Sequence, residues 1–271
     1  MTFFYPPRGS GQFTAAVGQA AIAAGARIQH ETRVTGVSQV GSGWEVRVEG
    51  PSGARVESGD LVVSSLPLPV LIQLLGEIVP KDVSEAAREL HYRAMCIINL
   101  FVDRPNVFPD QWVYYSAPSL PFNRINEFTN LAPGFSPKGK TALNCEITCT
   151  RGDQTWNKPD EELRDLCIEH LVRLGVLARS EVFGHSVARL PNAYPIFDVG
   201  CEKRLGGVLG FLKTLPGIAT AGRQGRFEYI NMDECIWHAT DVVRALLAGV
   251  DGASSQEGSP THDSAVPSVH R

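Results

Sequence analysis

The hydrophobic pattern in the first third of the chain predicts one helix and three strands. An alanine-rich segment from about Ser10 to Ala24 is rich in helix formers, and Gly25 behind it is a residue type that often ends a helix. Alternation over Arg27–Gln39, a Gly-Ser-Gly turn and a second run over Trp44–Glu49 predict a hairpin. The run Asp60–Ser65 is almost continuously apolar, which predicts a strand inside a sheet covered on both faces.

From Leu66 onward the pattern changes to consecutive β-rich runs separated by Pro, Gly and Asn. A short helix is predicted over Val70–Leu75, and Asp160–Leu174 has the apolar stripe and acidic first turn of an amphipathic helix. Runs of β-branched and aromatic residues predict strands at His91–Val102, Trp112–Ser116, Arg124–Thr129, Ala142–Thr150 and Val182–Leu190. Consecutive strands of this kind are typical of a mainly antiparallel sheet.

The last part of the chain predicts a bent connection, two helices and a strand. The connection is at 191–195, the first helix at 200–213, the strand at Ile218–Ala221 and the second helix at Asp233–Leu247. Residues 251–271 are mostly Ser, Gly, Pro, Gln and His, so we expect a disordered tail there. Helices and strands in this proportion predict an α/β protein.

Composition and charge limit the classes of partner. The 271 residues suffice for one large domain or two intertwined ones, and the net charge is only −4. Without a basic run, neither nucleic acid nor an anionic membrane is indicated as a partner. The longest apolar stretches are too short to span a bilayer, and the opening residues lack the pattern of a signal peptide. We therefore expect a cytoplasmic protein with no membrane span.

The six cysteines, at positions 96, 145, 149, 167, 201 and 235, include no CxxC pair. Cys145 and Cys149 lie four apart in a predicted strand, so both face one side. We expect reduced core thiols and no metal site.

The segment Ala221–Asp233, AGRQGRFEYINMD, combines features that suit a ligand site. Gly222 follows a short strand and permits close backbone approach, while Arg223 and Arg226 offer planar donors suited to phosphate. Asn231 followed by Glu234 fits a capping box, which leaves the first N–H groups of a helix open to an anion. The alternative is an ordinary strand, turn and well-capped helix, and the residues alone leave both interpretations open.

This segment resembles the flavin-contacting C-terminal motif of FAD-dependent oxidoreductases in the amine oxidase and protoporphyrinogen oxidase group, which has UDP-galactopyranose mutases among its relatives. The resemblance implies FAD as cofactor. It places Gly222 and Arg223 at the FAD diphosphate, and Met232 and Asp233 beside the flavin O2 and N1. There the helix dipole would stabilise the negative charge of reduced flavin.

Two further blocks resemble the same group in order and spacing. The block FFYPPRGSGQFTAAVGQAAIAAGARIQHETRVTGV implies that the strand ending near Val34 runs past the adenosine half of FAD, which makes Val34 a candidate cofactor contact. The block DLVVSSLPLPVL implies that Ser65, Leu66 and Pro67 lie close to the cofactor. The resemblance as a whole spans most of residues 3–247.

One element of the family pattern has no counterpart. The family begins with a βαβ unit whose GxGxxG turn and later acidic residue bind the ADP moiety, and this sequence contains no such unit. We expect a truncated chain, or a partner chain that supplies the dinucleotide-binding half. The resemblance then implies an incomplete FAD-binding lobe (1–68 and 192–250) interwoven with a mainly antiparallel substrate lobe (69–191).

Candidate substrate contacts lie in the strand-rich part. The resemblance implies a substrate-binding sheet, and Arg124 among apolar neighbours needs a partner. Strand alternation puts Tyr114 and Tyr115 on opposite faces, so one of them can face a ligand, and we select Tyr115. Tyr194, in the NAYPIF stretch, resembles a family residue near the substrate. Core packing is the alternative for these aromatic residues.

The sequence contains no convincing general base, so the catalytic residues are unknown. Gly184–Ala188 only faintly resembles a nucleophile elbow, and His91, His170 and His238 are isolated. The resemblance implies an FAD-dependent oxidoreductase that transfers a hydride from a C–N or C–C bond of a small organic substrate to flavin. The alternatives are a mutase-like isomerase, which needs arginines that clamp a nucleotide-sugar diphosphate, and a non-catalytic remnant or accessory subunit.

Overall fold

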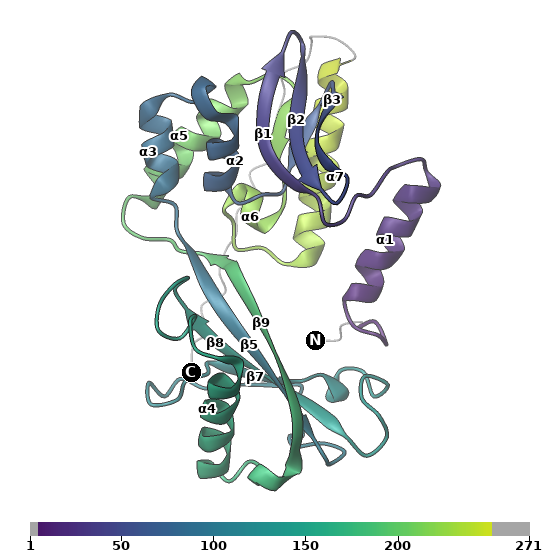
Figure 1. Cartoon of the computed structure of the whole chain (residues 1–271), viewed down its shortest axis with the longest axis vertical. Coiled ribbons are helices and arrows are strands. Elements are labelled where there is room, and N and C mark those ends of the chain that lie inside the picture. The colour runs from purple at the N-terminus through teal and green to yellow at the C-terminus, as the bar shows by residue number, and fades with distance from the viewer. Residues whose placement is uncertain (1–4, 251–271) are drawn as a thin grey trace, which may run out of the picture.

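The computed structural model describes residues 5–250 and consists of an upper and a lower part joined by two strands (Figure 1). The disordered tail expected at 251–271 lies outside the described residues. The helices are α1 Gly11–Ala23, α2 Leu68–Leu75, α3 Lys81–Arg88, α4 Asp160–Arg173, α5 Cys201–Thr214, α6 Gly222–Arg226 and α7 Met232–Val250. The strands are β1 Arg33–Val40, β2 Gly43–Gly50, β3 Gly53–Gly59, β4 Val62–Ser64, β5 Tyr92–Val102, β6 Trp112–Tyr114, β7 Arg124–Glu127, β8 Thr141–Cys149, β9 Val182–Pro195 and β10 Ile218–Thr220. The predicted α/β class is confirmed.

The upper part is built around one hydrophobic cluster. It combines the antiparallel sheet β1-β2-β3 with helices α2, α3 and α5. Trp44 of β2 is only 2% exposed, and its indole N–H donates to the Pro216 carbonyl at 3.0 Å. This bond fixes the antiparallel sheet to the start of β10.

Strand β4 pairs in parallel with β10, and these two strands form a sheet of their own within residues 5–250. The prediction that β4 is covered on both faces is wrong for the described residues, since Val63 is 46% exposed. Parallel sheets are normally buried on both faces, whereas the exposure of Val63 leaves this small sheet open on one side.

The lower part is a five-stranded antiparallel sheet in the order β6-β7-β8-β5-β9. Alternate residues of β5, from Ala94 to Val102, point into a second hydrophobic cluster beneath α4. The predicted antiparallel sheet and amphipathic helix are therefore confirmed. The face of the sheet away from α4 carries polar side chains.

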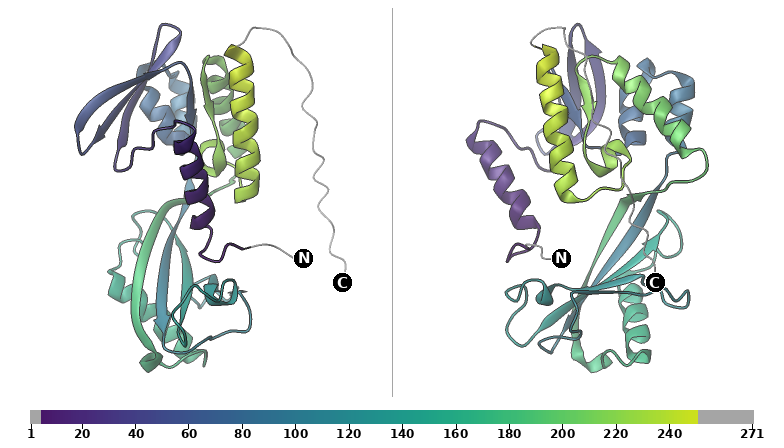
Figure 2. Two further views of the ribbon diagram at one scale, coloured as in Figure 1. Left: turned by 90° about the vertical axis from the view of Figure 1, so that its right-hand side faces the viewer. Right: turned by 180° about the vertical axis from the view of Figure 1, so that it is seen from behind.

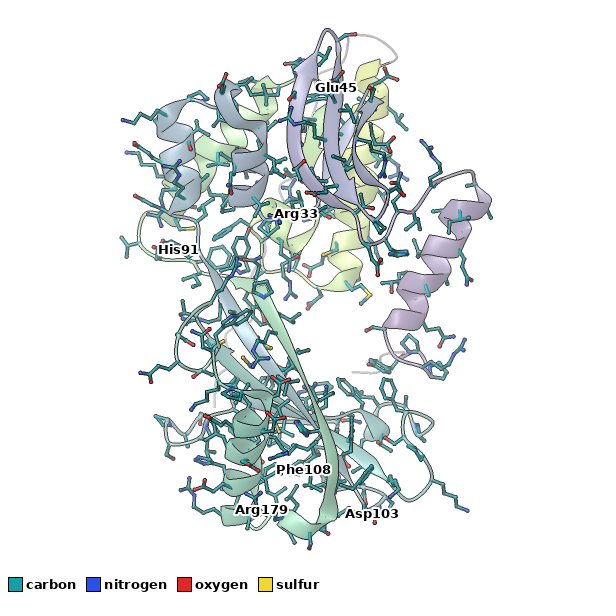
Figure 3. All side chains as sticks on the ribbon, in the orientation of Figure 1. Arg33, Glu45, His91, Asp103, Phe108 and Arg179 are labelled. Carbon is teal, nitrogen blue, oxygen red and sulfur yellow. The ribbon has the colours of Figure 1, made fainter. Side chains whose placement is uncertain are left out.

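The junction between the two parts is held by side chains around α6. The Tyr92 hydroxyl on β5 donates to the Gln224 carbonyl at 2.6 Å, and the Gln224 amide donates to the Asn192 carbonyl on β9 at 3.1 Å. His91 lies at the point where β5 leaves the upper part (Figure 3), and its carbonyl accepts from Ile196 N. Helix α6 is thus tied to both strands that cross between the parts.

Two helices are poorly covered. No residue of α1 is buried, and α1 stands apart from the other elements in Figure 1 and in the right-hand view of Figure 2. On α7, Met232, Ile236, Val243 and Leu247 share one face at helical spacing, and each is 44–53% exposed. Within residues 5–250, no helix has the length and apolar character needed to cross a bilayer.

Several predicted boundaries were wrong. Strand β1 begins at Arg33 rather than Arg27, because Glu31 has a positive φ of 52° that interrupts extended backbone. Residues 191–195 were predicted as a connection, but β9 continues through them with a register shift opposite Arg93 and Met95. Strand β3 and helix α3 were missed; β3 is largely exposed and lacks a regular apolar pattern.

Candidate functional site

The candidate site begins where β10 ends and the chain turns into α6. Gly222 has a φ of +78°, a conformation that glycine adopts without strain, and a Cβ there would meet no atom within 4 Å. The backbone at Gly222 therefore faces open space and is accessible to a ligand.

Gly225, which the sequence analysis did not select, lets α6 lie on the end of β4. A Cβ at Gly225 would stand 2.9 Å from the Ser64 carbonyl oxygen and 3.3 Å from Ser65 Cα. Ala221 N also donates to the Ser64 carbonyl at 2.9 Å. Two predicted cofactor-binding stretches, the one at Ser65 and the one at Gly222, are thus adjacent. Pro67 follows directly at the start of α2.

Arg223 is held by aromatic rings rather than by a carboxylate. Its guanidinium carbon lies 4.9 Å from the ring centroid of Tyr194 and 5.3 Å from that of Tyr229. The Arg223 Nε donates to the Ile230 carbonyl at 2.8 Å. No acidic side chain among residues 5–250 forms an ion pair with Arg223, so its positive charge is available to an anion.

Arg226, the second arginine of the motif, is already paired. Its Nε donates to Glu228 Oε1 at 2.9 Å, and Glu228 Oε2 lies 3.2 Å from His238 Nδ1 of α7. The charge of Arg226 is compensated inside the protein. Only Arg223 of the two suits a phosphate ligand from outside.

The start of α7 has one half of the predicted capping box. Glu234 accepts from the backbone N–H of Asn231 at 2.7 Å, which is the reciprocal half of a capping box. Within the described chain, the backbone N–H groups of Met232, Asp233 and Glu234 have no acceptor, so the positive end of the helix dipole is open.

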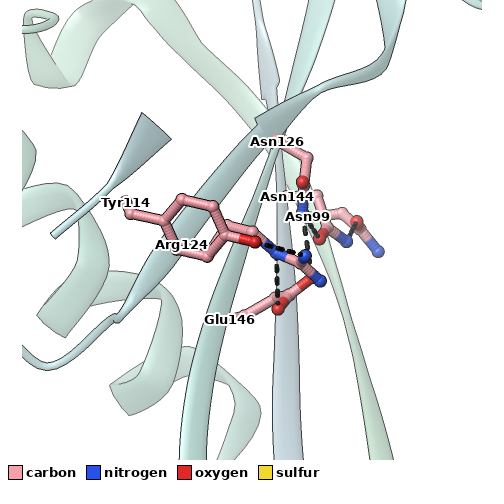
Figure 4. Close-up of polar contacts among 6 residues, drawn as sticks. All are labelled: Asn99, Tyr114, Arg124, Asn126, Asn144 and Glu146. Atoms are coloured by element: carbon pink, nitrogen blue, oxygen red, sulfur yellow. Dashed lines mark hydrogen bonds and ion pairs between the residues drawn. The ribbon is translucent and has the colours of Figure 1, made fainter. Parts of the chain in front are cut away.

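Arg124 lies on the polar face of the lower sheet. Its Nε and Nη2 donate to the two carboxylate oxygens of Glu146 at 2.9 and 2.6 Å, and its Nη1 donates to the Tyr114 hydroxyl at 3.3 Å (Figure 4). The predicted partner of Arg124 is therefore Glu146, which the sequence analysis did not identify.

The tyrosine that shares the face of Arg124 is Tyr114, not Tyr115. Tyr115 packs edge-on against Phe122 at 5.3 Å beside the lower hydrophobic cluster. Burial raises the pKa of its hydroxyl. Tyr115 therefore has the packing role that we kept as the alternative, and its assignment to the substrate has no support in the geometry.

The structure brings some of the candidate residues together and separates others. Tyr194, Arg223 and the start of α7 meet at the junction of the two parts. Val34 lies in β1, opposite Val48, and packs on the upper cluster. Tyr229 was not selected from the sequence, although its aromatic ring beside Arg226 was a usable signal.

Comparison with known proteins gives a consistent result. The family described as flavin containing amine oxidoreductase matches residues 4–199. A solved structure of reduced UDP-galactopyranose mutase is similar with a TM-score of 0.77 and 19% identity over 92% of this chain and 53% of that chain. A putative protoporphyrinogen oxidase from Exiguobacterium sp. 255-15 is similar with a TM-score of 0.72 and 18% identity, over 90% of this chain and 52% of that chain. A putrescine oxidase with redesigned cofactor binding is similar with a TM-score of 0.67 and 14% identity, over 89% of this chain and 53% of that chain.

At these identities the solved structures establish the fold. The chain spans about half the length of each of them, 52–53%. No curated protein sequence matches the chain.

Proposed function

Because the chain belongs to the family of flavin containing amine oxidoreductases, we propose that it forms part of an FAD-dependent oxidoreductase that takes a hydride from a small organic substrate. The observation that carries this proposal is Arg223, whose charge no carboxylate of the described chain neutralises. It lies between an open glycine and an open helix start. This arrangement fits an extended anionic cofactor whose ring carries an electron-rich carbonyl group.

Gly222 and Arg223 would hold the FAD diphosphate. The open space at Gly222 lets backbone N–H groups approach phosphate oxygens, and Arg223 supplies charge and paired donors. Tyr194 and Tyr229 stack on each other and fix the guanidinium plane. Ser65 and Pro67 would border the same stretch of cofactor.

The first turn of α7 would meet the flavin ring. Bound flavin supplies the hydride-accepting centre, and the protein supplies orientation and electrostatics. The N–H groups of Met232 and Asp233 can donate to the ring carbonyl, and the helix dipole there favours negative charge. Val34 would border the adenosine half. We assign residues 1–68 and 192–250 to the FAD-binding lobe and 69–191 to the substrate lobe.

A mutase-like isomerase is the weaker alternative. It requires arginines that clamp a nucleotide-sugar diphosphate, and Arg124 was the candidate in the substrate lobe. The bidentate ion pair with Glu146 neutralises the charge of Arg124 and uses its Nε and one Nη2 donor. This contact favours the oxidoreductase.

A strand-and-helix unit outside residues 5–250 would complete the cofactor site. It would pack on three surfaces, which are the exposed Val63 of β4, the apolar face of α7 and the uncovered α1. That unit would bind the ADP moiety, and it belongs either to the same protein or to a partner chain. A chain without the unit would be a remnant or accessory subunit.

The test is to purify the chain and record its visible spectrum and its thermal stability with FAD. Flavin absorption bands, or a rise in Tm that increases with FAD concentration, would support the proposal. A colourless protein whose Tm does not respond to FAD would reject FAD binding by this chain alone. For a yellow protein, reduction of the flavin by amines rather than by nucleotide sugars would identify the oxidoreductase.

A further inference from the structure

The face of the lower sheet away from α4 carries a row of three asparagines across three strands, which we call the carboxamide row (Asn126, Asn144, Asn99). The strand register places Asn144 opposite both other members. Asn126 Nδ2 donates to Asn144 Oδ1 at 3.0 Å, and Asn144 Nδ2 donates to Asn99 Oδ1 at 2.8 Å (Figure 4). On β9 the row ends at Ser186, whose hydroxyl oxygen accepts from Asn99 Nδ2 at 3.1 Å.

Next to the carboxamide row, the positive charge of Arg124 is neutralised by Glu146. Glu146 accepts two hydrogen bonds from Arg124 and a third from Asn126 Nδ2 at 2.9 Å. Burial works to lower the pKa of Arg124, but the hydrogen bonds to Glu146 and Tyr114 outweigh it and raise that pKa above its ordinary range. Arg124 therefore remains protonated, and its ion pair with Glu146 adds no net charge to the face.

Some of the uncharged donors and acceptors of the carboxamide row have no protein partner within residues 5–250. Among the described residues no donor reaches Asn126 Oδ1, and one N–H each of Asn144 and Asn99 has no acceptor. Exposed aromatic side chains flank the row on β6, where Tyr114 is 65% exposed and Trp112 is 41% exposed. The combination offers both donors and acceptors next to aromatic surface.

We propose that this face binds the uncharged amide or hydroxyl part of a substrate, and that Glu146 determines specificity by neutralising Arg124 and so excluding anionic ligands. An anion that approached Arg124 would meet the Glu146 carboxylate at hydrogen-bond distance from the same guanidinium and would be repelled. A neutral amide would meet no such repulsion. The proposal rests on the proposed function only in calling the ligand a substrate.

The experiment compares succinamide with succinate, which have similar shapes but differ in charge. Both are titrated without FAD, and the fluorescence of Trp112 reports binding, with Trp112→Phe to identify its signal. An Arg223→Gln background removes the other candidate anion site. We expect succinamide to bind at least about tenfold more tightly than succinate, because each unfavourable charge contact weakens binding by about this factor or more. We also expect Glu146→Gln to reverse the order.

Three results would overturn the proposal. These are absence of succinamide binding, tighter binding of succinate in the Arg223→Gln protein, or unchanged selectivity in a folded Glu146→Gln variant. If Glu146→Gln does not fold, succinate binding by Arg124→Gln is compared with that of the Arg223→Gln parent. A loss of succinate binding in Arg124→Gln would also contradict the proposal, because it would show that Arg124 binds anions despite Glu146. Since no step requires flavin, failure of FAD binding would leave the outcome interpretable.

Discussion

Tyr194 at the end of β9 and Tyr229 between α6 and α7 stack with their ring centroids 5.4 Å apart and their planes at 27°. They are 35 positions apart in the sequence, and Arg223 lies against both rings. This contact joins the strand that crosses between the two parts to the segment proposed for the cofactor diphosphate.

Replacing Arg223 by Gln should weaken FAD binding by about 10- to 100-fold, since a charge-assisted hydrogen bond contributes about 1.5–3 kcal/mol. Quenching of flavin fluorescence on titration with protein measures the affinity. Arg226→Gln is the matched control, and it should change the affinity much less because Glu228 already neutralises Arg226. Equal losses in the two variants would contradict the assignment of the diphosphate to Arg223.

Gly225→Ala should destabilise the fold by about 1–3 kcal/mol, because its Cβ would stand 2.9 Å from the Ser64 carbonyl oxygen. Gly207→Ala in α5 is the control. It has open space around its Cβ and should gain about 0.5–1 kcal/mol from helix propensity. Urea unfolding gives both free energies of unfolding, and an unchanged value for Gly225→Ala would refute the close packing.

Glu127→Ala should cost about 3–5 kcal/mol. Glu127 is fully buried, and its carboxylate accepts from Val107 N at 2.8 Å, Phe108 N at 2.7 Å and the Thr141 hydroxyl at 2.8 Å. Removing it leaves these buried donors without an acceptor. Thermal or urea denaturation measures the loss, and Glu85→Ala on an exposed face of α3 should change stability by less than about 0.5 kcal/mol. A similar effect of both substitutions would argue against this role of Glu127.

The native protein should react with one equivalent of a thiol reagent at neutral pH, and the denatured protein with six. All six cysteines are free, five are buried and Cys235 is partly exposed. Burial, reinforced by Cys96 at a sulfur–sulfur distance of 3.8 Å, raises the pKa of Cys149 to about 12. Its reactive thiolate is therefore scarce at neutral pH. Cys235→Ser should abolish the native reaction, and rapid labelling of additional thiols would show that one of the two hydrophobic cores is open.

The sequence predicted most elements because they have clear local signals. The amphipathic α4, the β-rich run of β5 and the capped start of α7 follow from periodicity and capping residues. The open side of β4 could not be predicted, since a continuous apolar run looks the same whether or not a second layer covers it.

The candidate site was predictable only in part. Gly222 and Arg223 were identified from one short segment, and the neutralised state of Arg226 depends on a contact with Glu228 that spacing alone does not reveal. The pairing of Arg124 with Glu146 depends on strand register, which the sequence does not specify across a loop of this length. The choice between Tyr114 and Tyr115 depends on the same register.

Strand β9 carries Tyr194 near one end and Ser186 nearer the other, so a single backbone segment fixes the spacing between the two proposed binding regions. A slip of one residue against β5 would turn Ser186 away from Asn99, because side chains alternate along a strand. The pairing of β9 with β5 is irregular between Leu190 and Tyr194. The register at the Tyr194 end therefore differs from the register at the Ser186 end. Insertions at this irregularity would therefore change the distance between the proposed cofactor and substrate regions while leaving each of them intact.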